Sequence, residues 1–200
     1  MSSEADVLYR RAVEAQEGGK PAEAERWHRA CLDLRQREGD EAGVSRSTHV
    51  LALLLHGLGR ESEAAEFYRA SLALFERLDQ AVGTADAAYQ LGDILAGKAE
   101  YPEAEAMFRR SLSAQEGLED NEDLLVQTLF GLARVGQKSG KLEMAQACLT
   151  RCLSIEESRG LMENQVEILL RLSQVATDRG RREEAEEYMV RLRRLRPADM

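Results

Sequence analysis

The sequence predicts an all-α fold, an α-solenoid of five helix–turn–helix repeats within a single domain over residues 1–200. Three observations predict it. Leu, Ala, Glu, Arg and Lys make up roughly half of the chain, a composition typical of helix-rich proteins. There are only three prolines, and β-branched residues are sparse, which disfavours an extensive β-sheet. The third observation is a short pattern that recurs about every 40 residues.

The recurring pattern starts at a residue that we call the anchor and continues with an alanine five positions later. It is clearest in GKPAEAERWHRACL at 19–32 and GRESEAAEFYRASL at 59–72. The spacings between anchors are 40, 40, 41 and 40 residues, which indicates five copies in phase. The anchors are Gly19, Gly59, Ala99, Gly140 and Gly180, and the alanines are Ala24, Ala64, Ala104, Ala145 and Ala185.

Each anchor is followed by a predicted amphipathic helix. A bulky residue stands four positions after the alanine and a mostly small one seven positions after it, so the three share one stripe of an α-helix. The bulky residues are His28, Tyr68, Phe108, Leu149 and Met189, and the third set is Cys31, Ser71, Ser111, Cys152 and Leu192.

A second helical stripe precedes each anchor. In the third copy it consists of Ala88, Leu91, Gly92 and Leu95, at offsets of three, four and seven. Glycine at the anchor would separate the two helices, because it tolerates the left-handed conformation that ends a helix. The links between copies are too short to be interdomain linkers. The predicted repeats are 4–38, 41–79, 81–119, 122–159 and 162–197.

These stripes carry a family resemblance. Ala88-x2-Leu91-Gly92-x2-Leu95, followed by Ala104-x3-Phe108, resembles the tetratricopeptide repeat (TPR). The units run to about 40 residues instead of about 34 and lack the proline near the end, which resembles the long-helix variant of kinesin light chains, spindle-orientation adaptors and bacterial peptide-sensing regulators. The resemblance implies a right-handed superhelix whose first helices line a concave groove. Arg11 replaces a stripe leucine in the first unit, as in a capping unit that faces water.

Within that implied groove, the first-helix positions outside the packing stripe are the candidate partner-binding residues. We call Tyr9, His49, Tyr89, Phe130 and Leu170 the first row, and Val13, Leu53, Asp93, Arg134 and Gln174, one turn later, the second row; His56 is a further candidate. Aromatic residues anchor interfaces, but they pack equally well against an adjacent repeat, and both readings stay open. Tyr89 and Phe130 are the favoured hot spot, with Arg134 binding a carboxylate.

Co-chaperones of the TPR family bind a C-terminal carboxylate through Lys and Asn side chains on their first helices. The matching surface here carries Asp6, Tyr9, Val13, His49, Leu53 and Asp86 instead, so chaperone-tail binding is not expected.

No catalytic set, metal site or cofactor is expected. His49 and His56 lie seven residues apart, about 10 Å along a helix, too far to chelate one metal. Cys148 and Cys152 share a helix face, but Cys152 belongs to the packing stripe. His28 likewise occupies a packing position.

A net charge of −9 disfavours nucleic acid and anionic membranes as partners. One arginine cluster, Arg191, Arg193, Arg194 and Arg196, is interpreted as a solvated helix face. The longest apolar run, Val50 to Leu55, is far below the roughly 20 residues that span a bilayer. The acidic N-terminus lacks a secretory signal, and three cysteines indicate a reducing cytoplasm.

The function predicted from the sequence is a non-enzymatic adaptor or scaffold that binds a protein or peptide partner in the groove. Two alternatives stay open. One is a scaffold that self-associates into a homo-oligomer through its ends or convex face, and the other is a peptide-responsive regulatory module.

Overall fold

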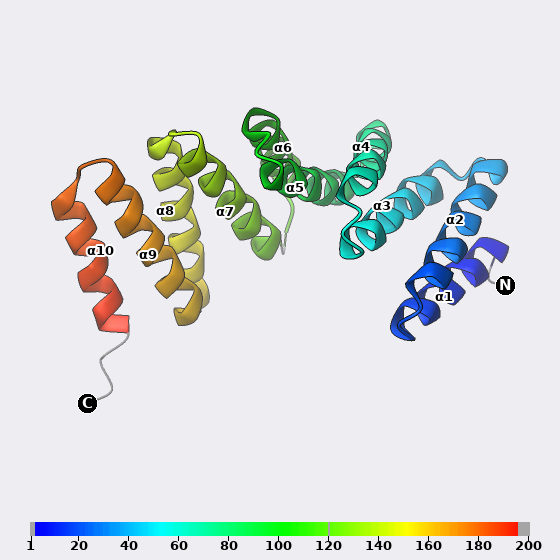
Figure 1. Ribbon diagram of the computed structural model, residues 1–200, viewed down its shortest axis with the longest axis horizontal. Helices are drawn as coiled ribbons and strands as arrows, with labels where there is room; N and C mark the ends of the chain where they lie inside the picture. Colours follow the sequence, from blue (N-terminus) through cyan, green and yellow to red (C-terminus); the bar gives the residue numbers. More distant parts are fainter. Residues whose placement is uncertain (1–2, 120, 196–200) are drawn as a thin grey trace. The chain divides into compact units, whose positions relative to one another are not determined.

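The computed structural model describes residues 3–119 and 121–195, and every regular element in these ranges is an α-helix (Figure 1). The all-α fold class is therefore confirmed. The helices are α1 (Glu4–Glu17), α2 (Pro21–Glu38), α3 (Glu41–Gly57), α4 (Glu61–Arg77), α5 (Ala81–Gly97), α6 (Tyr101–Ala114), α7 (Glu122–Lys138), α8 (Leu142–Arg159), α9 (Met162–Asp178) and α10 (Arg182–Leu195).

The first helix of each predicted repeat begins where the sequence places it, at residues 4, 41, 81, 122 and 162. The largest difference is at the end of α6, which stops at Ala114 although the predicted repeat extends to 119. Here the chain turns through Gly117, whose φ of 82° leaves the helical region. The last two residues of the fifth predicted repeat, including Arg196, lie outside the described residues.

The five anchors have a common turn geometry. Each has a positive φ: 67° at Gly19, 73° at Gly59, 60° at Ala99, 75° at Gly140 and 74° at Gly180. The residue after each anchor donates its backbone N–H to a carbonyl five positions earlier, as Arg60 does to Leu55 at 2.9 Å. This 6→1 hydrogen bond closes the helix end in a Schellman arrangement. Only the third anchor, Ala99, holds this conformation with a Cβ atom.

The predicted stripes form the core of each unit. All five alanines after the anchors are buried, and four of the five bulky residues that follow them are at most 1% exposed: His28, Tyr68, Phe108 and Leu149. The exception is Met189 in α10, which is only half-buried, as is Leu192. Burial of the stripe therefore weakens in the last helix of the described chain.

The chain divides into two compact units, residues 1–94 and 95–200. In the first, α1 packs on α2, α2 on α3 and α3 on α4. In the second, α6 packs on α7 and each later helix packs on the next. Packing between sequence neighbours is the contact pattern of a repeat array. The organisation of residues 1–200 as a single domain stays a prediction.

One buried position, sixteen residues after the anchor, holds a different residue in each of the first four repeats and meets a matching residue on the next first helix. Arg35 Nη1 donates to Ser47 Oγ at 2.7 Å and to the Gly43 carbonyl at 3.2 Å. The Phe75 ring covers Gly83 so closely that a Cβ atom there would lie 2.6 Å from the ring. The side chain at this position of a second helix thus determines which residue fits opposite it on the next first helix.

Two further joints show the same matching. Gln115 Nε2 donates to Thr128 Oγ1 at 3.1 Å. Glu156 is 1% exposed and accepts from Asn164 Nδ2 at 3.0 Å and from Arg159 Nη1 at 3.3 Å. A buried carboxylate is tolerated only when such partners satisfy it. Each joint between repeats therefore has its own complementary pair.

Candidate partner-binding surface

The first and second rows have members in both compact units. In residues 1–94, Tyr9 on α1 and Leu53 on α3 are exposed, at 38% and 39% of their surface. The Tyr9 ring meets the His28 ring edge-on at a centroid distance of 5.8 Å, so one side of it packs within its own repeat. Val13 is half-buried. Tyr9 therefore packs on one side and remains exposed on the other.

His49 is the least accessible member of the first row, with 9% of its surface exposed. Its Nε2 lies 2.9 Å from Asp86 Oδ2 on α5, and its ring contacts those of Tyr68 and Phe75 at 5.5 and 5.7 Å. Burial raises the pKa of Tyr68, so its phenol stays protonated. In this repeat the first-row residue His49 packs against neighbouring helices, as the packing alternative for the row predicts.

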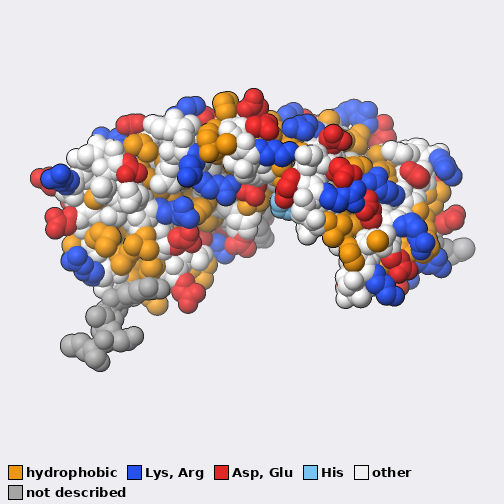
Figure 2. Space-filling model, in the orientation of Figure 1, with side chains coloured by type: hydrophobic (Ala, Val, Ile, Leu, Met, Phe, Trp, Pro, Cys, Tyr) orange, Lys and Arg blue, Asp and Glu red, His pale blue; other side chains and the backbone are white. Residues whose placement is uncertain are grey.

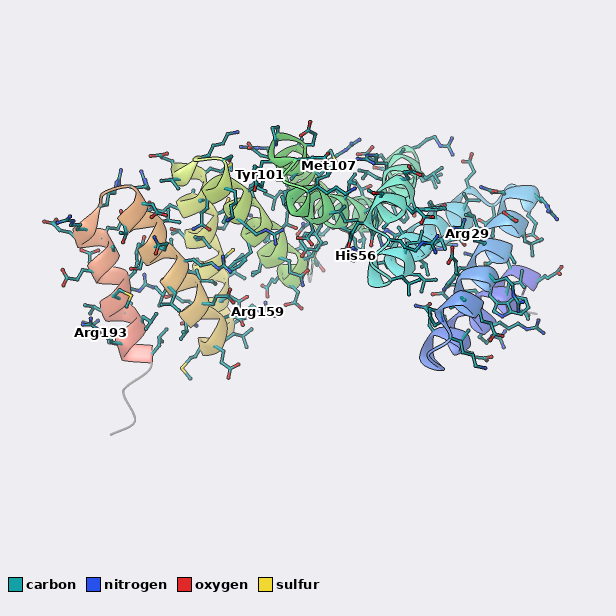
Figure 3. The ribbon with its side chains drawn as sticks, in the orientation of Figure 1. Arg29, His56, Tyr101, Met107, Arg159 and Arg193 are labelled. Atoms are coloured by element: carbon teal, nitrogen blue, oxygen red, sulfur yellow. The ribbon has the colours of Figure 1, made fainter. Side chains whose placement is uncertain are left out.

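The remaining candidates in the first unit are partly accessible. His56 lies at the α3–α4 turn, and its Nδ1 is 2.9 Å from Glu61 Oε2 (Figure 3). Tyr89 and Asp93, both on α5, are half-buried. The two histidines therefore pair with different carboxylates, and the structure does not bring His49 and His56 to one site.

In residues 95–200 the first row contains a contact that sequence reasoning missed. The Arg171 guanidinium lies 4.5 Å from the centroid of the Phe130 ring, which joins α9 to α7. Arg171 also pairs with Glu167 at 3.0 Å. A cation over an aromatic face contributes about 0.5–1 kcal/mol at an exposed site. The one sequence feature that could have indicated this contact is Arg171, which directly follows the first-row residue Leu170.

Three further row members of this unit are exposed. Leu170 on α9 is 48% exposed, and Arg134, one turn after Phe130 on α7, is exposed as well. Gln174 is exposed and donates to Asp178 Oδ1 at 2.7 Å. The second unit thus presents an apolar side chain, an aromatic ring and cationic groups on its first helices. Tyr89 belongs to the other unit, so the predicted hot spot is divided between the two.

The groups with chemical reactivity are engaged in packing. All three cysteines are free and buried, and burial raises the pKa of Cys152 to about 12 and also raises that of Cys148. His28 Nε2 lies 2.8 Å from Gln16 Oε1, and burial lowers the pKa of His28. Among the described residues no group of three His, Cys, Asp or Glu side chains is placed to hold a metal ion.

Charges of both signs are interleaved over the visible face of the molecule (Figure 2). In the described part of the chain, none of the helices is both long and apolar enough to traverse a bilayer.

Comparison with known proteins gives a consistent family assignment. The family model described as tetratricopeptide repeat matches residues 3–77 and 83–158. No curated protein matches the sequence. Among solved structures, the nearly identical TPR-like repeats of a putative kinesin light chain from Podosopora anserina align with a TM-score of 0.75 at 18% identity, covering 98% of this chain and 97% of that one.

Two other solved structures share the fold. MamA from Desulfovibrio magneticus RS-1, from residue 41 to its end, has a TM-score of 0.74 at 16% identity and covers 100% of this chain and 99% of its own. The apo form of RapI has a TM-score of 0.81 at 15% identity over 96% of this chain, but over only 54% of RapI. Such low identities show the fold alone. With five units of about 40 residues and a family model that matches most of its length, the chain belongs to the tetratricopeptide repeat family.

Proposed function

We propose that this protein is a non-enzymatic interaction module that binds a segment of a partner protein along the first and second rows. The observation that carries the proposal is the position of the exposed large apolar side chains. Three of the nine large apolar side chains that are exposed in the described part of the chain, Tyr9, Leu53 and Leu170, belong to the two rows, and they are 38–48% exposed. Exposed apolar side chains that recur on one helix face favour a binding surface over a solvated one.

The chemistry of the rows indicates what the partner segment contains. Aromatic rings with few rotatable bonds bind apolar side chains at low entropic cost, which favours Tyr9, Tyr89 and Phe130 as contact residues. We propose that Arg134, which is exposed on α7, binds a carboxylate of the partner in a bidentate manner. We therefore propose a segment with apolar side chains and at least one acidic residue. The free, buried cysteines accord with a reducing compartment, and we propose a cytoplasmic location.

The test starts from a displayed library of random peptides selected against the whole protein. Affinities of the selected peptides are then measured by fluorescence anisotropy for Tyr89→Ala and Arg134→Ala, one variant in each compact unit. We expect at least one of the two to weaken binding about tenfold or more, as interface hot spots do. Val82→Ala is the control, because Val82 is 67% exposed on α5 but lies outside both rows. Unchanged affinity in both row variants would refute the assignment of the rows.

A further inference from the structure

The second helices of the repeats contact one another through two recurring faces. We define the forward face as the sixth and tenth residues after an anchor, and the backward face as the first, fourth and eighth. In the joint between the first two repeats, forward residue Glu25 binds backward residue Arg60, with 2.6 Å between Oε2 and Nη1. Forward residue Arg29 lies over the ring of backward residue Phe67, at 5.5 Å (Figure 3). Forward and backward faces therefore bind each other.

The same pairing recurs in the second compact unit. Between the third and fourth repeats, Glu105 Oε2 lies 2.7 Å from Lys141 Nζ, and Arg109 Nη2 lies 3.5 Å from Met144 Sδ. The hydrogen bond from Lys141 holds the pKa of Glu105 below its usual range, although partial burial opposes this. Acidic forward residues thus pair with basic backward residues in two of the joints, those after the first and third repeats.

The joint between the fourth and fifth repeats uses the same faces with an uncharged forward residue. Forward residue Gln146 donates to backward residue Glu184, and to the backward residue Tyr188 at 3.4 Å. Here the sixth-position residue reaches the hydroxyl of the aromatic residue at the eighth position, whereas in the first joint the tenth-position Arg29 covers the Phe67 ring. In three joints, each inside one compact unit, forward residues contact backward residues.

The backward face of the first repeat forms a hollow of about 310 Å³. Its three members, Lys20, Glu23 and Trp27, line this hollow together with Arg11 and Glu14. Lys20 pairs with Glu23 at 3.8 Å, just as Arg60 pairs with Glu63 in the next repeat. Among the described residues, no acidic side chain from another repeat pairs with Lys20, whereas Glu25 of the first repeat pairs with Arg60 of the second.

The Trp27 ring on this face is held by its own repeat. The guanidinium groups of Arg11 and Arg26 lie 5.1 and 4.9 Å from its centroid. Arg11, Arg26 and Lys20 outnumber the two acids that line the hollow, Glu14 and Glu23, so the surroundings of the ring are basic on balance. The face thus combines an aromatic ring with positive charge.

The forward face of the last repeat forms a second hollow, of about 380 Å³, along α10. Its two members, Glu186 and Val190, line the hollow, and Val190 is 38% exposed. Glu183 and Glu187 lie beside them, followed by Arg191 and Arg194. This face therefore offers an acidic residue at the position of Glu25 and Glu105, with an apolar residue one turn later.

We propose that these two faces bind each other between two copies of the chain, so that the last repeat of one copy docks on the first repeat of the next. Glu186 pairs with Lys20, and Val190 packs against the Trp27 ring. The acidic start of α10 faces the basic surroundings of Trp27, which makes the charges complementary. We expect the partner to be a second copy of the chain, because forward and backward faces already bind each other at the joints inside the chain.

This contact is heterologous, so a pair of copies still has one unpaired face of each kind and association continues into larger assemblies. It goes beyond the proposed function, since it uses second helices and leaves the first and second rows to a partner protein. Loss of either binding activity would therefore leave the other measurable.

The experiment uses the full chain and its single tryptophan. Sedimentation velocity and Trp27 emission are followed as the concentration rises from about 1 to about 300 µM, a range that covers weak association. We expect the weight-average sedimentation coefficient to increase with concentration and the emission of Trp27 to change in parallel, because the only Trp in the sequence lies in the interface.

Charge reversals identify the faces. Lys20→Glu and Glu186→Lys should each lower the association constant at least about fivefold, since each replaces an attraction by a repulsion. A mixture of the two variants should recover association, because the Glu186 face of one then meets the Lys20 face of the other. Lys138→Glu and Glu66→Lys are the controls, because they change charge identically at exposed positions outside both terminal faces.

A wild-type chain that stays monomeric with constant Trp27 emission over this range would overturn the proposal. Association that persists unchanged in both single variants would overturn it as well, as would a mixture that associates no better than its components. Lys20 has 68% of its side chain exposed, and far-UV circular dichroism confirms that each variant is folded before it is compared.

Discussion

Replacing Gly59 by alanine and Ala99 by glycine should change the stability of this protein in opposite directions. Both residues are anchors of helix–turn–helix units, with φ values of 73° and 60°. A Cβ atom added at Gly59 would have no other atom within 4 Å, so the substitution creates no clash. The backbone conformation is then the main quantity that changes.

The expected magnitude follows from two opposing terms. A residue with a Cβ atom in the left-handed region costs about 1–2 kcal/mol relative to glycine. Alanine recovers about 0.4–1 kcal/mol of this, because it restricts the unfolded chain more than glycine does. Gly59→Ala should therefore destabilise the protein by about 0.5–1 kcal/mol, and Ala99→Gly should stabilise it by a similar amount.

Urea unfolding followed by circular dichroism measures both changes, and thermal unfolding adds a shift in Tm of about 2–4 °C per kcal/mol for a chain of this size. Gly57→Ala is the matched control. Gly57 ends α3 two residues earlier without a positive φ, and a Cβ there also meets nothing within 4 Å. If Gly59→Ala is as stable as Gly57→Ala, or if Ala99→Gly destabilises the chain, the explanation of the anchor turn is wrong.

Two further substitutions test buried positions. Burial lowers the pKa of His28 below its usual value near 6.5, so protonation favours the unfolded chain. The contribution of neutral His28 to the free energy of unfolding is therefore fully present above about pH 6.5, and it decreases as the pH falls toward the lower pKa of the folded state. His28→Gln should reduce this dependence in urea unfolding at about pH 7.5 and pH 5, and a pH slope retained in full would contradict the reasoning. Gly131→Ala should cost about 1–3 kcal/mol, because its Cβ would lie 2.5 Å from the Phe108 ring. Gly97→Ala, whose Cβ meets nothing within 4 Å, should cost nothing in the same unfolding assay, and equal stabilities of these two variants would argue against overpacking.

The helices and turns of this protein were predictable because their causes are local. An apolar stripe at offsets of three, four and seven residues specifies a helix face whatever lies beyond it. A glycine between two such stripes specifies the left-handed turn, and Gly19, Gly59, Gly140 and Gly180 all adopt it. Ala99 adopts it too, which shows that the flanking helices impose the turn even where the residue disfavours it.

The candidate surface was only partly predictable. The spacing of the first row is regular, but accessibility along it ranges from 9% at His49 to 48% at Leu170. His49 is covered because Tyr68, Phe75 and Asp86 converge on it from α4 and α5. Periodicity assigns a residue to a helix face, but only the side chains of neighbouring helices determine how much of that residue remains exposed. Whether the rows bind a partner stays a prediction.

The sequence by itself determined the number of repeats, their phase, the stripe that each helix buries and membership of a repeat family. The tertiary structure alone decided how one repeat recognises the next. Arg35, Phe75 and Gln115 occupy one repeating position, but their residue types and those of their partners Ser47, Gly83 and Thr128 change from repeat to repeat. Hydrogen bonds and close packing depend on the chemistry of both partners and on their distance in space. A periodic sequence pattern gives neither the identity of the contacting residue nor its distance.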